Sequence, residues 1–165
     1  MARIAILTAL LLATGIMTGN TTAEDETLFA HCAPMYLLVE RLKPKGAQAT
    51  GLTRQALVDA AEARLRSARL LVPMLKQMEN PQTRGREQRL YINVNIVSFG
   101  FHVIVQLDRH MKDLGYGVPG FAVVWETGST GTHGGDGTYI LGVLSRLLDK
   151  FLAAYLRVNE GHCSR

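Results

Sequence analysis

The chain has 165 residues, of which 47% are hydrophobic and 19% are charged, and its formal net charge is +4. This length suits about one domain with one core, and beyond the N-terminal region no segment is long and apolar enough to span a bilayer. The positive charge is concentrated in residues 41–89, with eleven Lys and Arg against four Asp and Glu. Such a region is either a solvated charged face or a contact for anionic lipid, acidic polysaccharide or an acidic partner.

The N-terminus predicts a cleavable secretory signal peptide over residues 1–23. Arg3 supplies a positive charge, residues 4–13 form an apolar run, and small residues precede a cleavage site after Ala23. A membrane anchor is the alternative interpretation, but glycine and polar residues interrupt the run well before the ~20 residues that a span requires. We therefore expect a single exported α+β domain over residues 24–165, most naturally periplasmic, with no transmembrane span. Export makes intracellular nucleic acid an unsuitable partner for the basic region.

Two cysteines, Cys32 and Cys163, lie near the two ends of the exported chain. An even number of cysteines in an oxidising compartment predicts one disulfide bond, which would close nearly the whole domain. The alternative is a reactive thiol, since His31 and His162 adjoin the cysteines in sequence.

The first half of the exported chain predicts a strand followed by an amphipathic helix. Residues 24–34 resemble an irregular arm, and residues 35–42 have the composition of a strand. A turn or loop is expected at residues 43–46, where Lys-Pro-Lys-Gly occurs. Thr53 then has the position of an N-cap, because apolar residues recur after it at helical spacing as far as Ala68.

The middle of the chain carries the clearest β pattern. Residues 70–72 allow a short strand, and the polar stretch 77–88 predicts an exposed loop. Apolar and polar residues alternate from Leu90 to Ile96 and again from Phe101 to Leu107, with a change of phase between the two runs. A hairpin that turns at residues 98–100 explains this change better than one bulged strand. Tyr91, Asn93 and Asn95 should then share the sheet face away from the helices.

The last third predicts a strand, a glycine-rich loop and a long helix. A connection over residues 114–120 leads to a strand over residues 121–127, and apolar residues recur at helical spacing from Thr138 to Asn159. The resulting order is β-α-(β)-β-β-β-α. It predicts an α+β fold, with a mostly antiparallel sheet of about four strands and two amphipathic helices on one face.

This element order resembles that of small helix-on-sheet accessory domains of the bacterial envelope. Examples are the N-terminal domain of the Tol–Pal translocation protein and the lipoproteins that assist outer-membrane assembly. The resemblance covers most of the exported chain as element order and includes no shared motif, so it assigns no residue a role. It implies a non-catalytic envelope module, although the lipid-anchor cysteine of those lipoproteins is missing.

The candidate ligand-binding site is the loop over residues 127–138, which contains five glycines in twelve residues. Its backbone N–H groups can form an anion-binding nest before the helix, with hydroxyl donors beside it. The alternative is a structural loop with Asp136 or Thr138 as the N-cap. The candidate residues are Ser129, Thr130, Thr132, His133, Gly134, Gly135 and Asp136.

Catalysis and metal binding are weaker hypotheses for this loop. Ser129, His133 and Asp136 are the three residue types of a hydrolase, but the Gly-x-Ser-x-Gly elbow is missing. A metal site would have to gather His102, His110, His133 and Asp136, and the chain contains no paired-ligand spacing. We therefore assign no catalytic residue, metal ligand or cofactor.

The functional expectation is an exported, non-enzymatic module that binds a partner protein or an anionic envelope component. The alternative is a small-ligand-binding protein, or a hydrolase, that uses the loop over residues 127–138. The sequence does not specify an oligomeric state.

Overall fold

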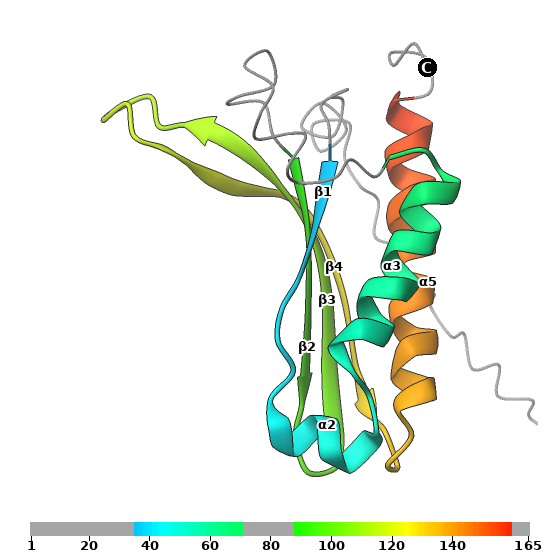
Figure 1. Ribbon diagram of the computed structural model, residues 1–165. Helices are drawn as coiled ribbons and strands as arrows, with labels where there is room; N and C mark the ends of the chain where they lie inside the picture. Colours follow the sequence, from blue (N-terminus) through cyan, green and yellow to red (C-terminus); the bar gives the residue numbers. More distant parts are fainter. Residues whose placement is uncertain (1–34, 71–87, 160–165) are drawn as a thin grey trace, which may run out of the picture.

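The computed structural model describes residues 35–70 and 88–159 (Figure 1). These residues form an α+β fold, as the sequence predicts, and the described elements are four strands and three helices. In chain order they are β1 (Met35–Val39), α2 (Pro44–Thr50), α3 (Arg54–Ser67), β2 (Gln88–Ile96), β3 (Gly100–Lys112), β4 (Pro119–Thr132) and α5 (Gly137–Asn159).

The strands form one mixed sheet in the order β1-β2-β3-β4. β1 runs parallel to β2, while β2–β3 and β3–β4 are antiparallel, so the sheet is mostly antiparallel as expected. The hairpin between β2 and β3 is also confirmed. Its turn is closed by a hydrogen bond of 2.9 Å from the Val97 N–H to the Gly100 carbonyl oxygen.

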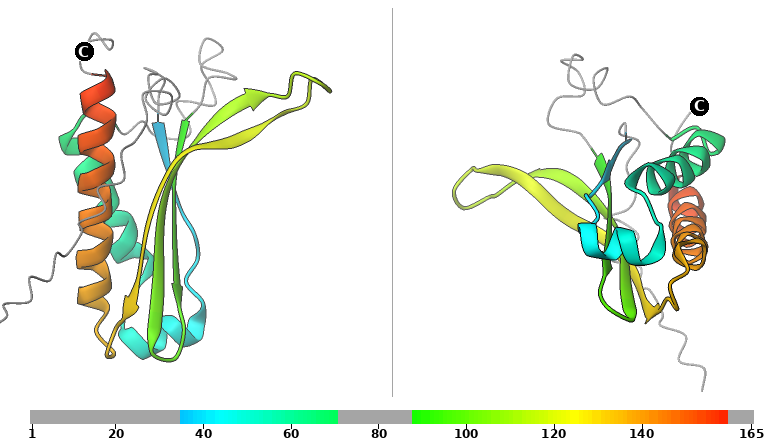
Figure 2. Two further views of the ribbon diagram at one scale, coloured as in Figure 1. Left: turned by 180° about the vertical axis from the view of Figure 1, so that it is seen from behind. Right: turned by 60° about the horizontal axis from the view of Figure 1, so that its bottom comes forward.

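Helices α3 and α5 lie side by side against one face of the sheet (Figures 1 and 2). The alternation in β2 and β3 turns every second side chain toward these helices, and the long helix α5 contributes an apolar stripe. Thr53 caps α3 as predicted, because its hydroxyl accepts a hydrogen bond from the Ala56 N–H at 3.1 Å. The fully buried side chains at this interface include Leu57, Leu65, Leu90, Ile92, Val103, Leu107, Ile140, Leu144, Leu148 and Phe151.

The opposite face of the sheet is not covered by a described helix. Tyr91 and Asn93 are half-buried and Asn95 is exposed, whereas their neighbours along β2 are buried. These three side chains therefore share the outer face, as the alternation predicts.

Helix α2 replaces the expected turn at residues 43–46. Pro44 occupies the first turn, where its missing N–H is not needed, and Gly51 ends the helix in the left-handed conformation at φ 68°. The preceding strand ends at Val39 rather than at residue 42. The pattern at residues 43–46 was interpreted as a turn or loop, although proline is also favoured in the first turn of a helix.

Strand β4 includes half of the segment that was expected to be a glycine-rich loop. Residues 127–132 pair with β3, from Thr127 opposite Val105 to Thr132 opposite Gly100. The prediction of a loop from residue 127 was wrong because the long β3 offers hydrogen-bonding partners that outweigh the low strand propensity of glycine.

Several predictions lie outside the described residues. They concern the signal peptide over 1–23, the arm over 24–34, the disulfide between Cys32 and Cys163, the short strand beyond Leu70, and the loop before Gln88. All of them stay predictions.

The β3–β4 hairpin continues past the body of the sheet as an arm (Figures 1 and 2). The pairing shifts between Leu107 and Asp108, where β4 has one additional residue, Val124. Such a bulge bends the strand pair. We call residues 108–123 the hairpin arm, and it curves away from the two long helices.

Candidate functional site

Three segments meet at the end of the molecule opposite the hairpin arm, which we call the basal end (Figure 1). They are α2, the β2–β3 turn (residues 97–99) and the turn before α5 (residues 133–136). A backbone hydrogen bond joins the two turns, since the His133 N–H donates to the Phe99 carbonyl oxygen at 3.1 Å. Their mutual contacts make the basal end one structural unit.

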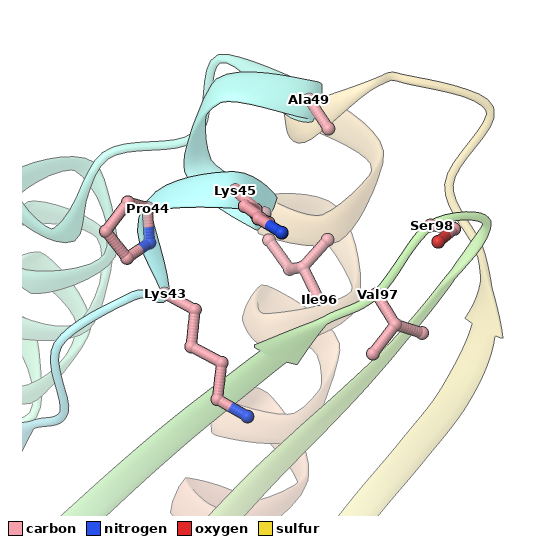
Figure 3. Close-up of a pocket in the computed structure, with 8 residues that line it drawn as sticks. Lys43, Pro44, Lys45, Ala49, Ile96, Val97 and Ser98 are labelled. Carbon is pink, nitrogen blue, oxygen red and sulfur yellow. The ribbon is translucent and has the colours of Figure 1, made fainter.

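A pocket of about 800 Å³ lies between α2 and the β2–β3 turn (Figure 3). Its lining is mainly apolar, with two lysines and one hydroxyl as its polar side chains. The residues that line it are Lys43, Pro44, Lys45, Gly46, Ala49, Ile96, Val97 and Ser98. A cavity of this size accepts a small organic molecule.

Gly46 sets the position of α2 against the end of β2. A Cβ atom on this residue would lie 2.7 Å from the Ile96 Cβ and 3.0 Å from the Ile96 carbonyl oxygen. The absence of a side chain therefore allows the helix to approach the strand closely. The Thr50 hydroxyl donates to the Gly46 carbonyl oxygen at 3.0 Å within the same helix.

The charged side chains that line this pocket are both cationic. Lys43 and Lys45 are exposed, so their ammonium groups retain contact with water while their stems border apolar surface. Within residues 35–70 and 88–159, the ion pairs are Arg64–Asp149, Arg66–Glu62 and Arg89–Asp108, none of which involves the pocket. The pocket therefore presents two cationic side chains beside an apolar surface, and one of them, Lys43, also interacts electrostatically with the Glu40 carboxylate.

The structure divides the predicted ligand-binding residues between a strand and a turn. Ser129, Thr130 and Thr132 belong to β4, and the Thr130 hydroxyl lies 2.7 Å from the His102 Nδ1. Ser129 alternates with Thr130 along the strand, so their side chains lie on opposite faces of the sheet. The structure therefore does not place these hydroxyls around one common centre.

His133 to Asp136 form the turn that leads into α5, with Gly134 and Gly135 at positive φ. The buried His133 ring contacts backbone through both nitrogens. Its Nδ1 accepts from the Gly135 N–H at 2.9 Å, and its Nε2 lies 3.0 Å from the Val97 carbonyl oxygen. The Nδ1 atom is thus the acceptor and Nε2 the donor, which ties the two basal turns together.

Asp136 acts as a helix cap, because its carboxylate accepts a hydrogen bond of 2.8 Å from the Thr138 N–H. With His133 held by Val97 and Gly135, the ring nitrogens are not available to activate the Ser129 hydroxyl. The described contacts therefore do not form a Ser-His-Asp hydrogen-bonded chain.

The histidines considered for a metal site are dispersed. His102 pairs with Thr130, His110 stacks edge-on against Phe121 at 5.5 Å, and His133 joins the basal turns. Across the ranges that the structure describes, no group of three or more His, Cys, Asp or Glu side chains is arranged to hold a metal ion.

The outer sheet face carries a polar cluster of Glu40, Tyr91 and Asn93. The Tyr91 hydroxyl and the Asn93 amide both donate to the Glu40 carboxylate. The hydrogen bond from Tyr91, followed by that from Asn93, lowers the pKa of Glu40 below its ordinary value of 4.5. Partial burial, together with the bond to Glu40, raises the pKa of Tyr91. These groups satisfy one another and leave this part of the face without an evident ligand site.

The sequence identified the turn at residues 133–136 but missed the pocket beside it. Lys43 and Lys45 were assigned to a turn and counted within the basic region. Two residues indicated this helix: Pro44 stands at a helix-starting position and Gly51 at a helix-ending position. The helix between them places both lysines over the end of β2.

Comparisons with known proteins identify no relative: no protein-family model, curated protein or solved structure matches the chain. None of the helices in the described ranges is both long enough and apolar enough to cross a membrane.

Proposed function

We propose that this protein is an exported, non-enzymatic binding module that holds an anionic amphiphile of the cell envelope in its basal pocket. The observation that supports this proposal is the combination of two lysines with an apolar cavity of about 800 Å³. An acidic headgroup would lie near Lys43 and Lys45, and the tail would cover Ile96 and Ala49. This proposal places the anion beside the predicted glycine-rich turn rather than within it.

The apolar contact supplies most of the affinity in this proposal. Each buried methylene contributes about 0.8 kcal/mol, which is about fourfold in affinity. The exposed lysines contribute less, about 1 kcal/mol or below for each pair of charges, because water and salt screen them. Tail length should therefore set the affinity, while the sign of the headgroup selects among amphiphiles of equal length.

The contacts of the turn over residues 133–136 support a binding role over a catalytic one. The His133 ring accepts a hydrogen bond from the Gly135 N–H, and the Asp136 carboxylate accepts one from the Thr138 N–H. A general base needs a free lone pair within reach of the proton that it removes. The turn supports the pocket wall instead, because His133 fixes the strand turn that carries Val97.

The N-terminal sequence supports the proposal that the protein is exported, and mass spectrometry of the recovered protein tests it. Protein recovered from the envelope fraction should begin at Glu24 and contain the Cys32–Cys163 disulfide. Recovery of the uncleaved chain in the cytosol would contradict this part of the proposal.

Calorimetric titration with decyl phosphate tests the binding function, with decyltrimethylammonium as a ligand of equal tail length and opposite charge. Wild type should bind the phosphate measurably more tightly. Substitution of both lysines by glutamine should reduce phosphate affinity by about tenfold, since two screened charge contacts are lost. Ala49→Trp should abolish binding by filling the pocket from an exposed position.

Lys112→Gln is the matched control, because it removes an exposed lysine at the other end of the molecule. It should leave decyl phosphate affinity unchanged. Equal affinity for the two amphiphiles, or an unchanged affinity in the Ala49→Trp protein, would overturn the proposed function.

A further inference from the structure

Glu40 places a negative charge beside the basal pocket, although it does not line the cavity. It lies between β1 and α2, three residues before Lys43, and its side chain is exposed. Its N–H donates a hydrogen bond of 2.9 Å to the Ile92 carbonyl oxygen. The chain is therefore attached to β2 directly before it enters the pocket wall at Lys43.

The Glu40 carboxylate is held in place by two side chains of β2. The Tyr91 hydroxyl and the Asn93 amide both donate to its Oε2 atom. In the part of the chain that the structure describes, no hydrogen bond ends on the Oε1 atom, which keeps its lone pairs for a further donor. A fixed carboxylate with open lone pairs is suited to a cationic partner.

Lys43 connects this carboxylate to the pocket, because it lines the cavity and also acts on Glu40. The pKa of Glu40 is lowered first by its hydrogen bonds with Tyr91 and Asn93, and then by the positive charge of Lys43. The ion pairs of the described residues do not include these two groups, so the Lys43 ammonium can also contact a ligand. Figure 3 shows the side chains of Lys43 and Lys45 extending in different directions.

The rim of the pocket therefore has charges of both signs. Lys43 and Lys45 are positive, and the fixed Glu40 carboxylate is negative and interacts with Lys43. A simple phosphate would be attracted by both ammonium groups but repelled by Glu40. A headgroup with an ammonium a few bonds from its phosphate would be attracted by all three groups.

Two arginines also lie close to Glu40. Arg41 follows it in the chain and is exposed, and Arg54 of α3 donates a hydrogen bond of 2.9 Å to the Val39 carbonyl oxygen. Neither arginine lines the pocket. Because arginine stays protonated, both contribute the same background charge in wild type and in every variant.

We propose that Glu40 determines the headgroup specificity of the basal pocket and favours an amphiphile with an ammonium beside its phosphate. This inference rests on the proposed function and narrows its ligand class. The phosphate would lie near Lys43 and Lys45, the tail would enter the cavity, and the ammonium would approach the Glu40 Oε1 atom. A headgroup of the phosphoethanolamine type has this arrangement of charges.

Calorimetric titration of the full chain with decyl phosphate and with decylphosphoethanolamine tests this inference. Glu40→Gln should raise the affinity for decyl phosphate and lower the affinity for decylphosphoethanolamine. Each change should be about two- to fourfold, the size expected for exposed charges that water and salt screen. Changes of opposite sign cannot come from general damage to the pocket.

Glu126→Gln is the matched control. Glu126 is also exposed and also accepts a hydrogen bond from a side-chain amide, that of Gln106, but it belongs to β4 and does not line the pocket. The control changes the net charge by the same amount as Glu40→Gln. It should leave both affinities unchanged.

NMR observation of the Glu40 carboxyl carbon provides a second measurement. Bound decyl phosphate should raise the pKa of Glu40, because a nearby negative charge disfavours the carboxylate. Bound decylphosphoethanolamine should lower this pKa further, because its ammonium favours the carboxylate. Phosphoethanolamine without a tail should bind at least about a hundredfold more weakly, because the apolar contact supplies most of the affinity.

The outcomes separate the role of Glu40 from the proposed function. If wild type binds both amphiphiles but Glu40→Gln changes neither affinity, or changes both in the same direction, the specificity role is wrong and the proposed function stands. A Glu40 pKa that moves in the same direction with both ligands would also contradict the specificity role. Equal affinity with and without the tail would overturn the proposed function alone, and no binding of either amphiphile would overturn both.

Discussion

His133 joins the two basal turns, so its removal tests whether this residue supports the pocket. His133→Ala deletes the 3.0 Å contact with the Val97 carbonyl oxygen and the acceptor of the 2.9 Å bond from the Gly135 N–H. Each lost hydrogen bond costs about 1 kcal/mol, and removal of a ring that is 6% exposed also leaves a cavity. We expect the free energy of unfolding to fall by about 2–4 kcal/mol.

Urea denaturation followed by the fluorescence of Trp125, the single tryptophan of the chain, measures this change. Thr130→Ala is the control, because it removes an exposed contact with His102 and should alter stability by less than about 0.5 kcal/mol. A His133→Ala protein as stable as the control would refute the structural role. The variant should also bind decyl phosphate more weakly, because His133 fixes the turn that carries Val97 of the pocket wall.

Three further substitutions test the packing. Gly137→Ala should lower stability by about 1–3 kcal/mol in urea, since its Cβ would lie 2.6 Å from a backbone carbonyl oxygen, whereas Gly142→Ala has space and should raise stability by up to about 1 kcal/mol. Arg89→Ala should cost about 2–4 kcal/mol by leaving the buried Asp108 carboxylate without its cation; no loss would contradict this. The folded pKa of Glu40 is lowered, so its stabilisation, at most about 0.5 kcal/mol, should be fully present above pH 4.5 and be lost progressively as the pH falls through the lowered folded pKa. A melting-temperature difference from Glu40→Gln that did not decrease as the pH was lowered would contradict this assignment.

Local patterns predicted most of the fold. The alternation in β2 and β3 specified both strands and the outer position of Tyr91, and the helical spacing after Thr53 specified α3. These predictions depend on neighbouring residues along the chain and on one buried face. They succeeded because the spacing of apolar residues along each element directly reflects which of its side chains are buried.

The predictions that failed depend on contacts between distant segments. Residues 127–132 became a strand because β3 is long enough to pair with them, which the composition of the segment does not reveal. The pocket depends on the close approach of Gly46 to Ile96, which are fifty residues apart. Sequence therefore located the glycine-rich turn, but it did not show that the two nearby lysines would face the end of β2.

The most direct test of the proposed binding site is an NMR titration of ¹⁵N-labelled protein with decyl phosphate. Binding in the basal pocket should shift amide signals mainly in residues 43–49 and 96–98, and the shifts should saturate at a single site. Residues 133–136 should respond more weakly, through the His133 contact with the β2–β3 turn. Shifts confined to the hairpin arm or the outer sheet face, or no shifts at high ligand concentration, would contradict the account.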